Sequence, residues 1–180
     1  MQSIAEVVCL LALIVPTVAF GQEPKPDPWA PVRFLVGKWQ GTAAGKAGDG
    51  TVTRQYEFVL GERYIHERNT STYPPQDRNK KGEVHEHWSF VSYDRARKVL
   101  VLRQFHIEGF VNQYSFRPEE SGPESLVFEG EAFENFGSKW RMRETYRILG
   151  PDEFTETFEL APPDKPFEVY SKNHFKRVRP

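Results

Sequence analysis

Cysteine is almost absent from this chain of 180 residues, whose only one, Cys9, lies in an N-terminal apolar run. A single cysteine excludes an internal disulfide framework and a cysteine-rich zinc site. An excess of one charge is also lacking, since 24 Lys and Arg stand against 25 Asp and Glu. No electrostatic feature therefore points to nucleic acid as a partner. A Gly-rich phosphate loop and a Gly-x-Ser-x-Gly nucleophile motif are missing too.

Aromatic residues are plentiful, with 14 Phe, 7 Tyr and 4 Trp. Such a content argues against a disordered chain, because disorder goes with few bulky apolar groups. The length suits one domain. The composition therefore predicts a single globular domain.

The first 21 residues have the pattern of a signal peptide. The apolar run 7–15 is shorter than the roughly 20 residues that a membrane span needs, and Ala19 and Gly21 supply the small residues of a cleavage site. The basic N-terminal region is missing, so a buried N-terminal strand or helix is the alternative. We expect cleavage before Gln22, export to the periplasm or the medium, and no membrane span in the mature chain.

Beyond a Pro-rich linker at 22–31, apolar residues recur mostly with a period of two across one domain, 32–180. Turn signals separate the segments every 8–12 residues, which favours an all-β fold of consecutive hairpins. The predicted strands are 36–44, 51–59, 62–73, 83–93, 98–106, 110–117, 125–134, 138–148, 153–160 and 168–178. The prediction is an up-and-down antiparallel β-barrel of about ten strands, wide enough to enclose a cavity.

One hairpin has a register that can be tested from its charges. With Phe136 at the centre of the turn, Glu129 faces Arg143 and Glu131 faces Arg141 across the two strands. The opposite face collects mainly apolar side chains and one acid: Phe128, Gly130, Ala132, Trp140, Met142, Glu144 and Tyr146. That face is predicted to point inward.

The segment Gly37-Lys38-Trp39 places a Gly-x-Trp motif at the start of the first strand. The indole can plug one end of a barrel, and Lys176 or Arg177 of the last strand can lie across its ring. With segments 56–64, 93–94, 108–110 and 175–177, this pattern resembles the calycin superfamily and, within it, uncharacterised bacterial lipocalin-like or nitrobindin-like barrels.

The resemblance implies two kinds of ligand. Lipocalin-like barrels hold small apolar molecules, whereas nitrobindins hold haem through a histidine on the last strand. In this sequence Tyr170 or Lys172 stands where that histidine would fall, and His174 is on the opposite face. The haem ligand is therefore not reproduced.

His85-Glu86-His87 is the sharpest local pattern for a metal site. Residues two apart on a strand share a face, and His106 is the candidate third ligand. A loop with an even number of residues, such as 95–98, places His87 opposite His106. An odd loop centred on Ala96 separates them, and the histidines are then solvated.

Several other side chains are candidates for the ligand site. His66 and Arg103 are the expected polar anchors. His66 is alternatively a general base or a polar filler, and Arg103 is alternatively a structural ion pair with Glu144. The expected cavity lining is Trp88, Phe105, Tyr114, Trp140 and Tyr146.

The leading functional hypothesis is an exported barrel that binds a small apolar or amphipathic molecule, with no catalytic residue and no cofactor. The first alternative is a haem- or metal-dependent isomerase or oxidoreductase of the nitrobindin type, built around His85, His87 and His106. The second is a structural or interaction barrel with a filled interior. The oligomeric state is not predicted.

Overall fold

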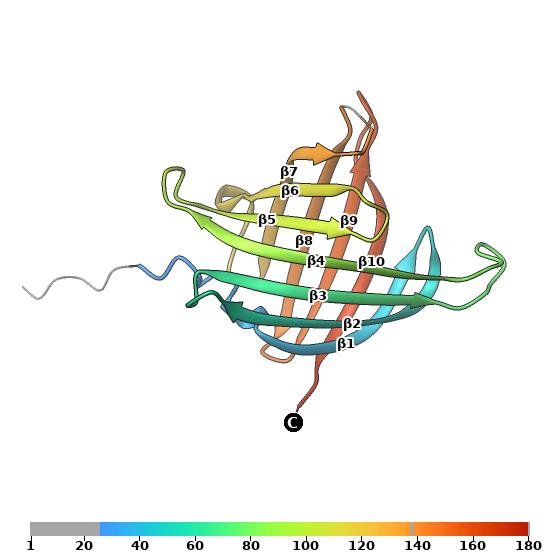
Figure 1. The fold of residues 1–180 in the computed structure, drawn as a ribbon, viewed down its shortest axis with the longest axis horizontal. Helices are drawn as coiled ribbons and strands as arrows, with labels where there is room; N and C mark the ends of the chain where they lie inside the picture. The colour runs from blue at the N-terminus through green and yellow to red at the C-terminus, as the bar shows by residue number, and fades with distance from the viewer. Residues whose placement is uncertain (1–25, 138, 180) are drawn as a thin grey trace, which may run out of the picture.

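The computed structural model describes residues 26–137 and 139–179, so the predicted signal peptide, 1–21, lies outside the described residues. Ten antiparallel strands close into a barrel (Figure 1). The strands are β1 Gly37–Gly45, β2 Gly48–Val59, β3 Tyr64–Tyr73, β4 Glu83–Asp94, β5 Val99–His106, β6 Val111–Phe116, β7 Ser125–Glu134, β8 Arg141–Gly150, β9 Glu153–Ala161 and β10 Glu168–Arg177. Every predicted strand is present, with ends within three residues of those expected.

Each strand pairs with its neighbours in the sequence, and β1 closes the barrel by pairing with β10. Two short 3-10 helices, η1 (Arg33–Leu35) and η2 (Pro118–Glu120), accompany the strands. Closure pairs the backbones of β1 and β10, so neither terminal strand is a free sheet edge. The predicted up-and-down barrel is therefore confirmed.

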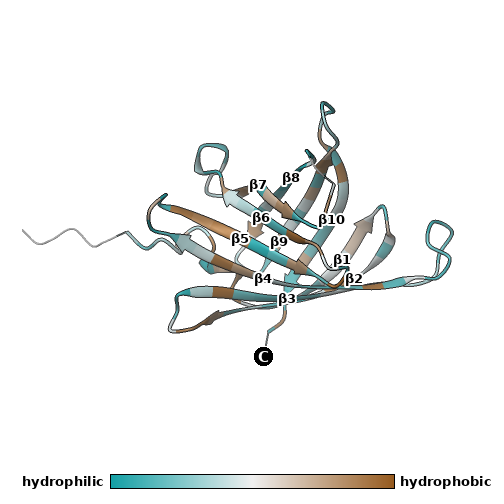
Figure 2. Ribbon diagram, turned by 45° about the horizontal axis from the view of Figure 1, so that its top comes forward, coloured by the Kyte–Doolittle hydropathy of each residue, from teal (hydrophilic) through white to brown (hydrophobic). Residues whose placement is uncertain are grey.

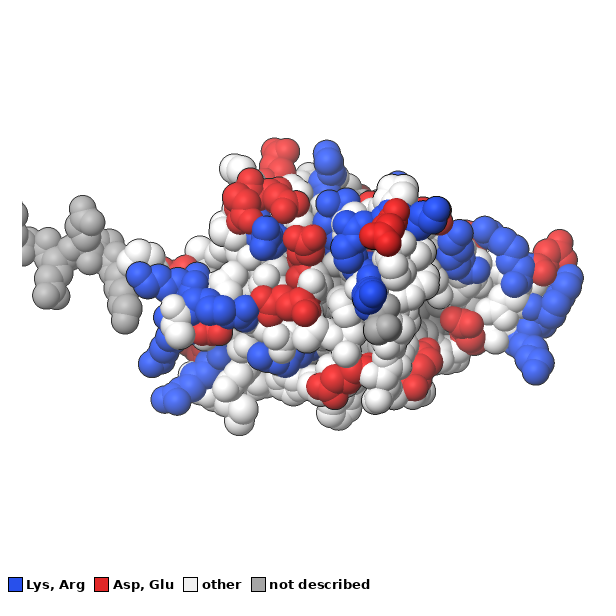
Figure 3. Space-filling view, turned by 90° about the horizontal axis from the view of Figure 1, so that it is seen from above, with Lys and Arg blue, Asp and Glu red and all other residues white. Residues whose placement is uncertain are grey.

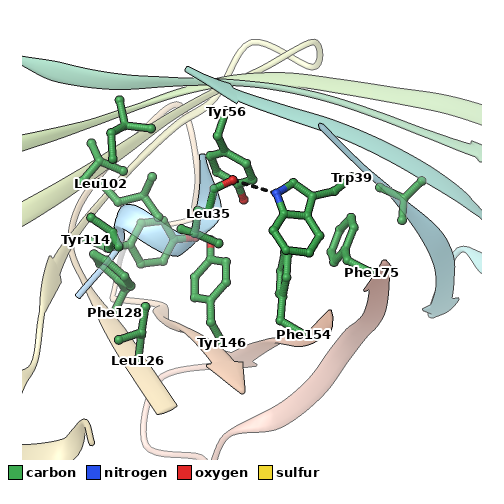
Figure 4. Packing of buried hydrophobic residues seen from close by; sticks show 14 of the residues in the cluster. Leu35, Trp39, Tyr56, Leu102, Tyr114, Leu126, Phe128, Tyr146, Phe154 and Phe175 are labelled. Carbon is green, nitrogen blue, oxygen red and sulfur yellow. Dashed lines mark hydrogen bonds between the residues drawn. The ribbon is translucent and has the colours of Figure 1, made fainter. Parts of the chain in front are cut away.

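Apolar side chains fill one half of the barrel, the half that contains η1. Here Trp39, Phe154 and Phe175 pack against one another, with ring centroids of successive pairs 4.7 Å apart. Figure 4 shows these rings together with Tyr56 and Tyr146, and Figure 2 shows how apolar and polar segments alternate along the strands. Burial of these aromatic groups is the main stabilising contribution to the closed half.

Trp39 plugs this end of the barrel as the Gly-x-Trp motif predicts. Its indole N–H donates to the Leu35 carbonyl oxygen at 2.7 Å, and the Arg177 guanidinium carbon lies 4.1 Å from the centre of the indole ring system. Gly37 has φ +131°, and a Cβ at this position would stand 2.6 Å from Arg177 Nη1. Only glycine combines that backbone conformation with the close approach of Arg177.

The hairpin of β7 and β8 has the predicted register for part of its length. Glu129 faces Arg143, as expected, but the ladder ends at this pair, so the expected pairing of Glu131 with Arg141 is wrong. Beyond Glu129, β7 pairs only with β6, and Glu131 accepts hydrogen bonds from Arg97 and Gln113.

The end of the predicted linker is seated on the barrel. Residues 28–32 form turns, and Trp29 packs edge-on against Phe58, with ring centroids 5.6 Å apart. In the two described ranges, no helix has the length and apolar character to cross a membrane. Lys, Arg, Asp and Glu are interspersed over the face in Figure 3.

Candidate ligand cavity and histidine cluster

The half of the barrel opposite the Trp39 plug contains a cavity of about 540 Å³. It lies toward the end of the barrel where β5 turns into β6 and β7 into β8. The lining residues are Gly45, Ala47, Arg54, Asn69, Ser71, Tyr73, Glu83, His85, His87, Gln104, His106, Glu108, Phe110, Asn112, Phe136, Trp140, Met142, Glu144, Glu156, Phe158, Leu160, Tyr170, Ser171 and Asn173.

Aromatic side chains form much of the wall near the mouth of the cavity. Phe110 stacks on His106 at a centroid distance of 4.2 Å, and Phe136 packs edge-on against Trp140 at 5.8 Å. Phe158 contributes a ring from β9. This part of the wall therefore offers apolar surface to a guest.

The floor of the cavity is polar, and Arg54 is at its centre. Arg54 is 4% exposed and makes a bidentate pair with Glu156, with N–O distances of 2.7 and 2.9 Å. Its Nε lies 2.9 Å from Glu67 Oε1 and donates to Asn69 Oδ1 at 3.0 Å. One face of the guanidinium lies over the Phe175 ring, with its central carbon 4.5 Å from the ring centre.

Two buried carboxyl groups near Arg54 have opposite protonation behaviour. Burial by itself raises the pKa of Glu67, but Arg54 and His87 outweigh it and bring that pKa to about 2. Burial and the neighbouring Glu156 charge raise the pKa of Glu144 to about 8. Tyr146 donates its hydroxyl proton to Glu144 Oε2 at 2.9 Å. The floor thus holds an ionised Glu67 and, at neutral pH, a protonated Glu144.

Three histidines converge on one wall of the cavity. The turn between β4 and β5 has four residues, 95–98, so His87 stands directly opposite His106. His85 Nε2 lies 3.4 Å from His87 Nδ1 and 3.4 Å from His106 Nδ1. The even-loop alternative is therefore the one that the structure adopts, and it brings all three predicted residues together.

The outer ring nitrogen of each histidine has its own polar neighbour. His85 Nδ1 is 2.8 Å from Glu108 Oε1, and His87 Nε2 is 3.2 Å from Glu67 Oε1. His106 Nε2 is 3.1 Å from the amide nitrogen of Asn112. Burial, followed by the neighbouring His87 and His85, lowers the pKa of His106 to about 2, so its ring is neutral at physiological pH.

Four of the expected ligand residues lie on the outer face of the barrel, so their placement inside was wrong. Trp88 and Phe105 are 57% and 45% exposed. His66 stacks on Phe90 with ring centroids 4.7 Å apart, and Arg103 donates to Ser92 Oγ at 3.1 Å rather than pairing with Glu144. The strands alternate faces, and Gln104 and His87 take the inward positions beside them.

The other three expected lining residues point inward. Trp140 lines the cavity. Tyr114 and Tyr146, at 0% and 2% exposed, belong to the apolar core and do not line the cavity. Their hydroxyl groups contact Asn112 and Glu144, which do line it. The two tyrosines therefore hold two polar side chains of the cavity lining in place by hydrogen bonds.

Arg54 and Gln104 are two of the inward polar residues that the sequence reasoning missed. Arg54 stands directly across from Trp39 in the β1–β2 register, and residues opposite each other in a ladder share a face. The Gly-x-Trp motif could therefore have identified Arg54. Gln104 had no such signal, because it sits in an apolar run where Phe105 is the more hydrophobic neighbour.

The last strand does not supply a haem ligand from its inner face. Ser171 and Asn173 are the β10 side chains that line the cavity together with Tyr170. Lys172 is exposed, and His174 binds Glu153 at 2.7 Å, away from the cavity lining. Haem held by a histidine of the last strand therefore does not fit these residues.

Comparison with solved structures supports the fold. The crystal structure of Rv2717c from M. tuberculosis is similar, with a TM-score of 0.61 and 14% identity over 86% of this chain and 99% of that one. A redesigned β-barrel, b11L5F_LGL, matches at a TM-score of 0.38 and 10% identity over 81% and 93% of the two chains, which is too low to bear on the fold. No protein-family model and no curated protein matches the sequence.

Proposed function

We propose that this barrel binds a small amphipathic molecule in its interior cavity. The observation that carries the proposal is a cavity of about 540 Å³ with an aromatic mouth and a buried polar floor. Ligand pockets typically have volumes of about 300–1,000 Å³ and combine apolar walls with a few polar groups. A structural barrel with a filled interior would have no such space.

One buried carbonyl oxygen on the floor has no hydrogen-bond partner among the described residues. Gln104 is 2% exposed, lines the cavity, and its Oε1 accepts no hydrogen bond. A buried carbonyl oxygen without a partner costs about 1–3 kcal/mol. A hydrogen-bond donor on the guest would recover this cost, which supports a ligand with a hydroxyl, amide or amine group.

The charges of the floor favour a neutral guest over an anionic one. Among the described lining residues, Arg54 is the one Lys or Arg, and Glu156, Glu67 and Asn69 already occupy its N–H groups. An anionic head group would meet Glu156 without a free cation to offset it. We therefore expect the neutral member of a pair of similar probes to bind more tightly.

The test uses two fluorescent probes, neutral N-phenyl-1-naphthylamine and anionic 1-anilinonaphthalene-8-sulfonate. The neutral probe should bind one per chain and more tightly than the anionic one. Leu160→Trp, which fills part of the cavity, should weaken binding about tenfold or more, equal to about 1.4 kcal/mol. The same change at Leu149, which is 52% exposed outside the cavity, is the matched control and should have no effect.

Failure of both probes to saturate, or equal weakening by Leu149→Trp and Leu160→Trp, would contradict the proposal. Native mass spectrometry of the purified chain, compared with the same sample denatured, gives an independent measurement. A non-covalent adduct of a few hundred daltons would identify the guest by its mass.

Export is part of the same proposal. The signal-peptide pattern at 1–21 predicts that the mature protein begins at Gln22. Expression of the full chain in an exporting bacterial host, followed by N-terminal sequencing of the periplasmic and secreted fractions, tests it. A protein that starts at Met1 and stays in the cytoplasm would contradict export and leave ligand binding untouched.

A further inference from the structure

We propose that His85, His87 and His106 bind a zinc ion on the wall of the cavity, with one coordination position open to the interior. This site goes beyond the binding of a small molecule and does not depend on it. Three features support the site: the spacing of the inner ring nitrogens, the partners of the outer ring nitrogens, and the position of the cluster.

The inner nitrogens have the spacing of zinc ligands. Zn–N bonds of about 2.0–2.1 Å in a tetrahedral arrangement place neighbouring nitrogens about 3.3–3.4 Å apart. His85 Nε2 lies 3.4 Å from both His87 Nδ1 and His106 Nδ1. The three nitrogens all lie within 4.8 Å of one another. Small side-chain rotations would therefore bring all three to bonding distance from one ion.

The outer partners fix which nitrogens carry protons. Glu108 Oε1 faces His85 Nδ1 at 2.8 Å, and Glu67 Oε1 faces His87 Nε2 at 3.2 Å. A carboxylate can only accept, so these outer nitrogens are the protonated ones. In the neutral rings, His85 Nε2 and His87 Nδ1 then present lone pairs to each other across 3.4 Å. A cation between them converts this repulsion into two bonds, as in the carboxylate–histidine–zinc triads of metalloproteins.

The third histidine has an amide in place of a carboxylate. Asn112 is 1% exposed, and its Oδ1 has no partner, while its Nδ2 lies 3.1 Å from both His106 Nε2 and Tyr114 Oη. The oxygen and nitrogen of an amide exchange places by a half turn. After that turn Oδ1 accepts from His106 Nε2–H and from the Tyr114 hydroxyl, which leaves His106 Nδ1 free to bind the ion.

The position of the cluster leaves room for a fourth ligand. All three imidazoles line the cavity, so the remaining corner of a tetrahedral ion faces the interior. Three protein ligands with one open position are typical of catalytic zinc sites, whereas structural sites use four. A purely imidazole donor set suits zinc and cobalt better than calcium or magnesium, which prefer oxygen.

The test is a titration of the tag-free full chain with Co²⁺, followed by displacement with Zn²⁺. One equivalent of Co²⁺ should produce the intense visible absorption of a four-coordinate ion, and Zn²⁺ should abolish it. His87→Ala should weaken binding about 100-fold or more, because a ligand matters more than an outer-shell partner. His174→Ala is the matched control, since His174 also pairs with a glutamate but lies outside the cavity.

Two further variants keep the proposal testable if His87→Ala destabilises the fold. His85→Gln replaces a ligand on a partly exposed side chain and should abolish the Co²⁺ spectrum. Glu108→Gln changes only the outer partner and should weaken Zn²⁺ binding about tenfold with the spectrum retained. Circular dichroism should show the fold of each variant unchanged.

Absence of a visible Co²⁺ band, or a band that persists in both His85→Gln and His87→Ala, would overturn the zinc site. The naphthylamine assay distinguishes this failure from failure of the proposed function. A barrel that binds the probe but not Co²⁺ is a ligand carrier without a metal, and one that binds Co²⁺ but not the probe is a metal protein without an apolar guest.

Discussion

Glu144 should make the barrel less stable as the pH rises, and Glu144→Gln should remove that dependence. Burial and the charge of Glu156 raise the pKa of Glu144 from about 4.5 to about 8 in the folded protein. Between these two values the folded chain keeps a proton that the unfolded chain has released. Stability therefore falls as the pH rises through this window. Below about pH 4.5 this carboxyl group is protonated in both the folded and the unfolded state, and it does not lower the free energy of unfolding.

The size of the effect follows from the change in pKa. Each unit corresponds to about 1.36 kcal/mol, so the penalty approaches about 5 kcal/mol above pH 8 and about 3 kcal/mol at pH 7. Glutamine has the shape of the protonated acid and can still accept a hydrogen bond from the Tyr146 hydroxyl group, whose oxygen lies 2.9 Å from Glu144 Oε2. The variant should exceed the stability of the parent protein by about 1 kcal/mol at pH 5 and by about 4 kcal/mol at pH 8.

Urea denaturation followed by tryptophan fluorescence, at pH 5, 6, 7 and 8, measures the free energy of unfolding directly. The quantity of interest is the difference in the free energy of unfolding between variant and parent, because contributions common to both proteins then cancel. Glu124→Gln, on an exposed residue, is the control and should follow the parent curve. Parallel curves for Glu144→Gln and the parent would refute the reasoning.

Three other substitutions test the fold. Trp39→Ala removes the plug, its hydrogen bond to the Leu35 carbonyl oxygen and its contact with Arg177. The variant should lower the free energy of unfolding by about 3–5 kcal/mol in urea denaturation, and an unchanged midpoint would refute the role of Trp39 as a plug. Arg54→Met leaves buried carboxylates without their cation and should lower the free energy of unfolding by a similar amount, about 3–5 kcal/mol. The double variant Arg54→Met with Glu156→Gln should recover part of that loss. Trp88→Ser, on an outer side chain, should change stability by about 1 kcal/mol or less and leave probe binding intact.

The strands and the plug were predictable because each depends on local chemistry. Alternation of polar and apolar residues defines a strand wherever one face is wet, and the turn residues mark its ends. Gly37 and Trp39 are fixed by a close contact with Arg177 that only this pairing of residue types allows. The closed half of the barrel could therefore be predicted from the sequence.

The half of the barrel that contains the cavity reverses the usual relation between hydrophobicity and burial. On β5, Leu100 and Leu102 point into the core, and two residues further on Gln104 also points inward while Phe105 points outward. A cavity with a polar floor places amides and charges inside the barrel, and the neighbouring aromatic side chains then alternate to the outside. Trp88 follows the same rule. The ligand predictions failed here because they ranked residues by apolar character.

The histidine cluster depended on one structural detail, the length of the turn after β4. Asp94 Oδ1 accepts the backbone N–H groups of Ala96 and Arg97, at 3.0 and 3.1 Å, and Lys98 takes a φ of +57° to complete the four-residue loop. Asp at the start of a turn favours such bonds, but other loop lengths allow them too. The sequence identified the three histidines and the loop length that would bring them together. Which loop length the hairpin adopts is known only from the register of β4 and β5 in the structure.

The buried charges link the floor of the cavity to the histidine cluster. Arg54 pairs with two carboxyl groups, Glu67 and Glu156, so acidic groups outnumber basic ones around it. Glu67 Oε1 is shared between Arg54 Nε and His87 Nε2, so this excess of acidic groups lies next to the histidine cluster. An uncompensated buried charge is expensive, and a cation bound by His87 and its neighbours would offset it. The same arrangement that argues against an anionic guest on the floor therefore favours a metal ion on the wall.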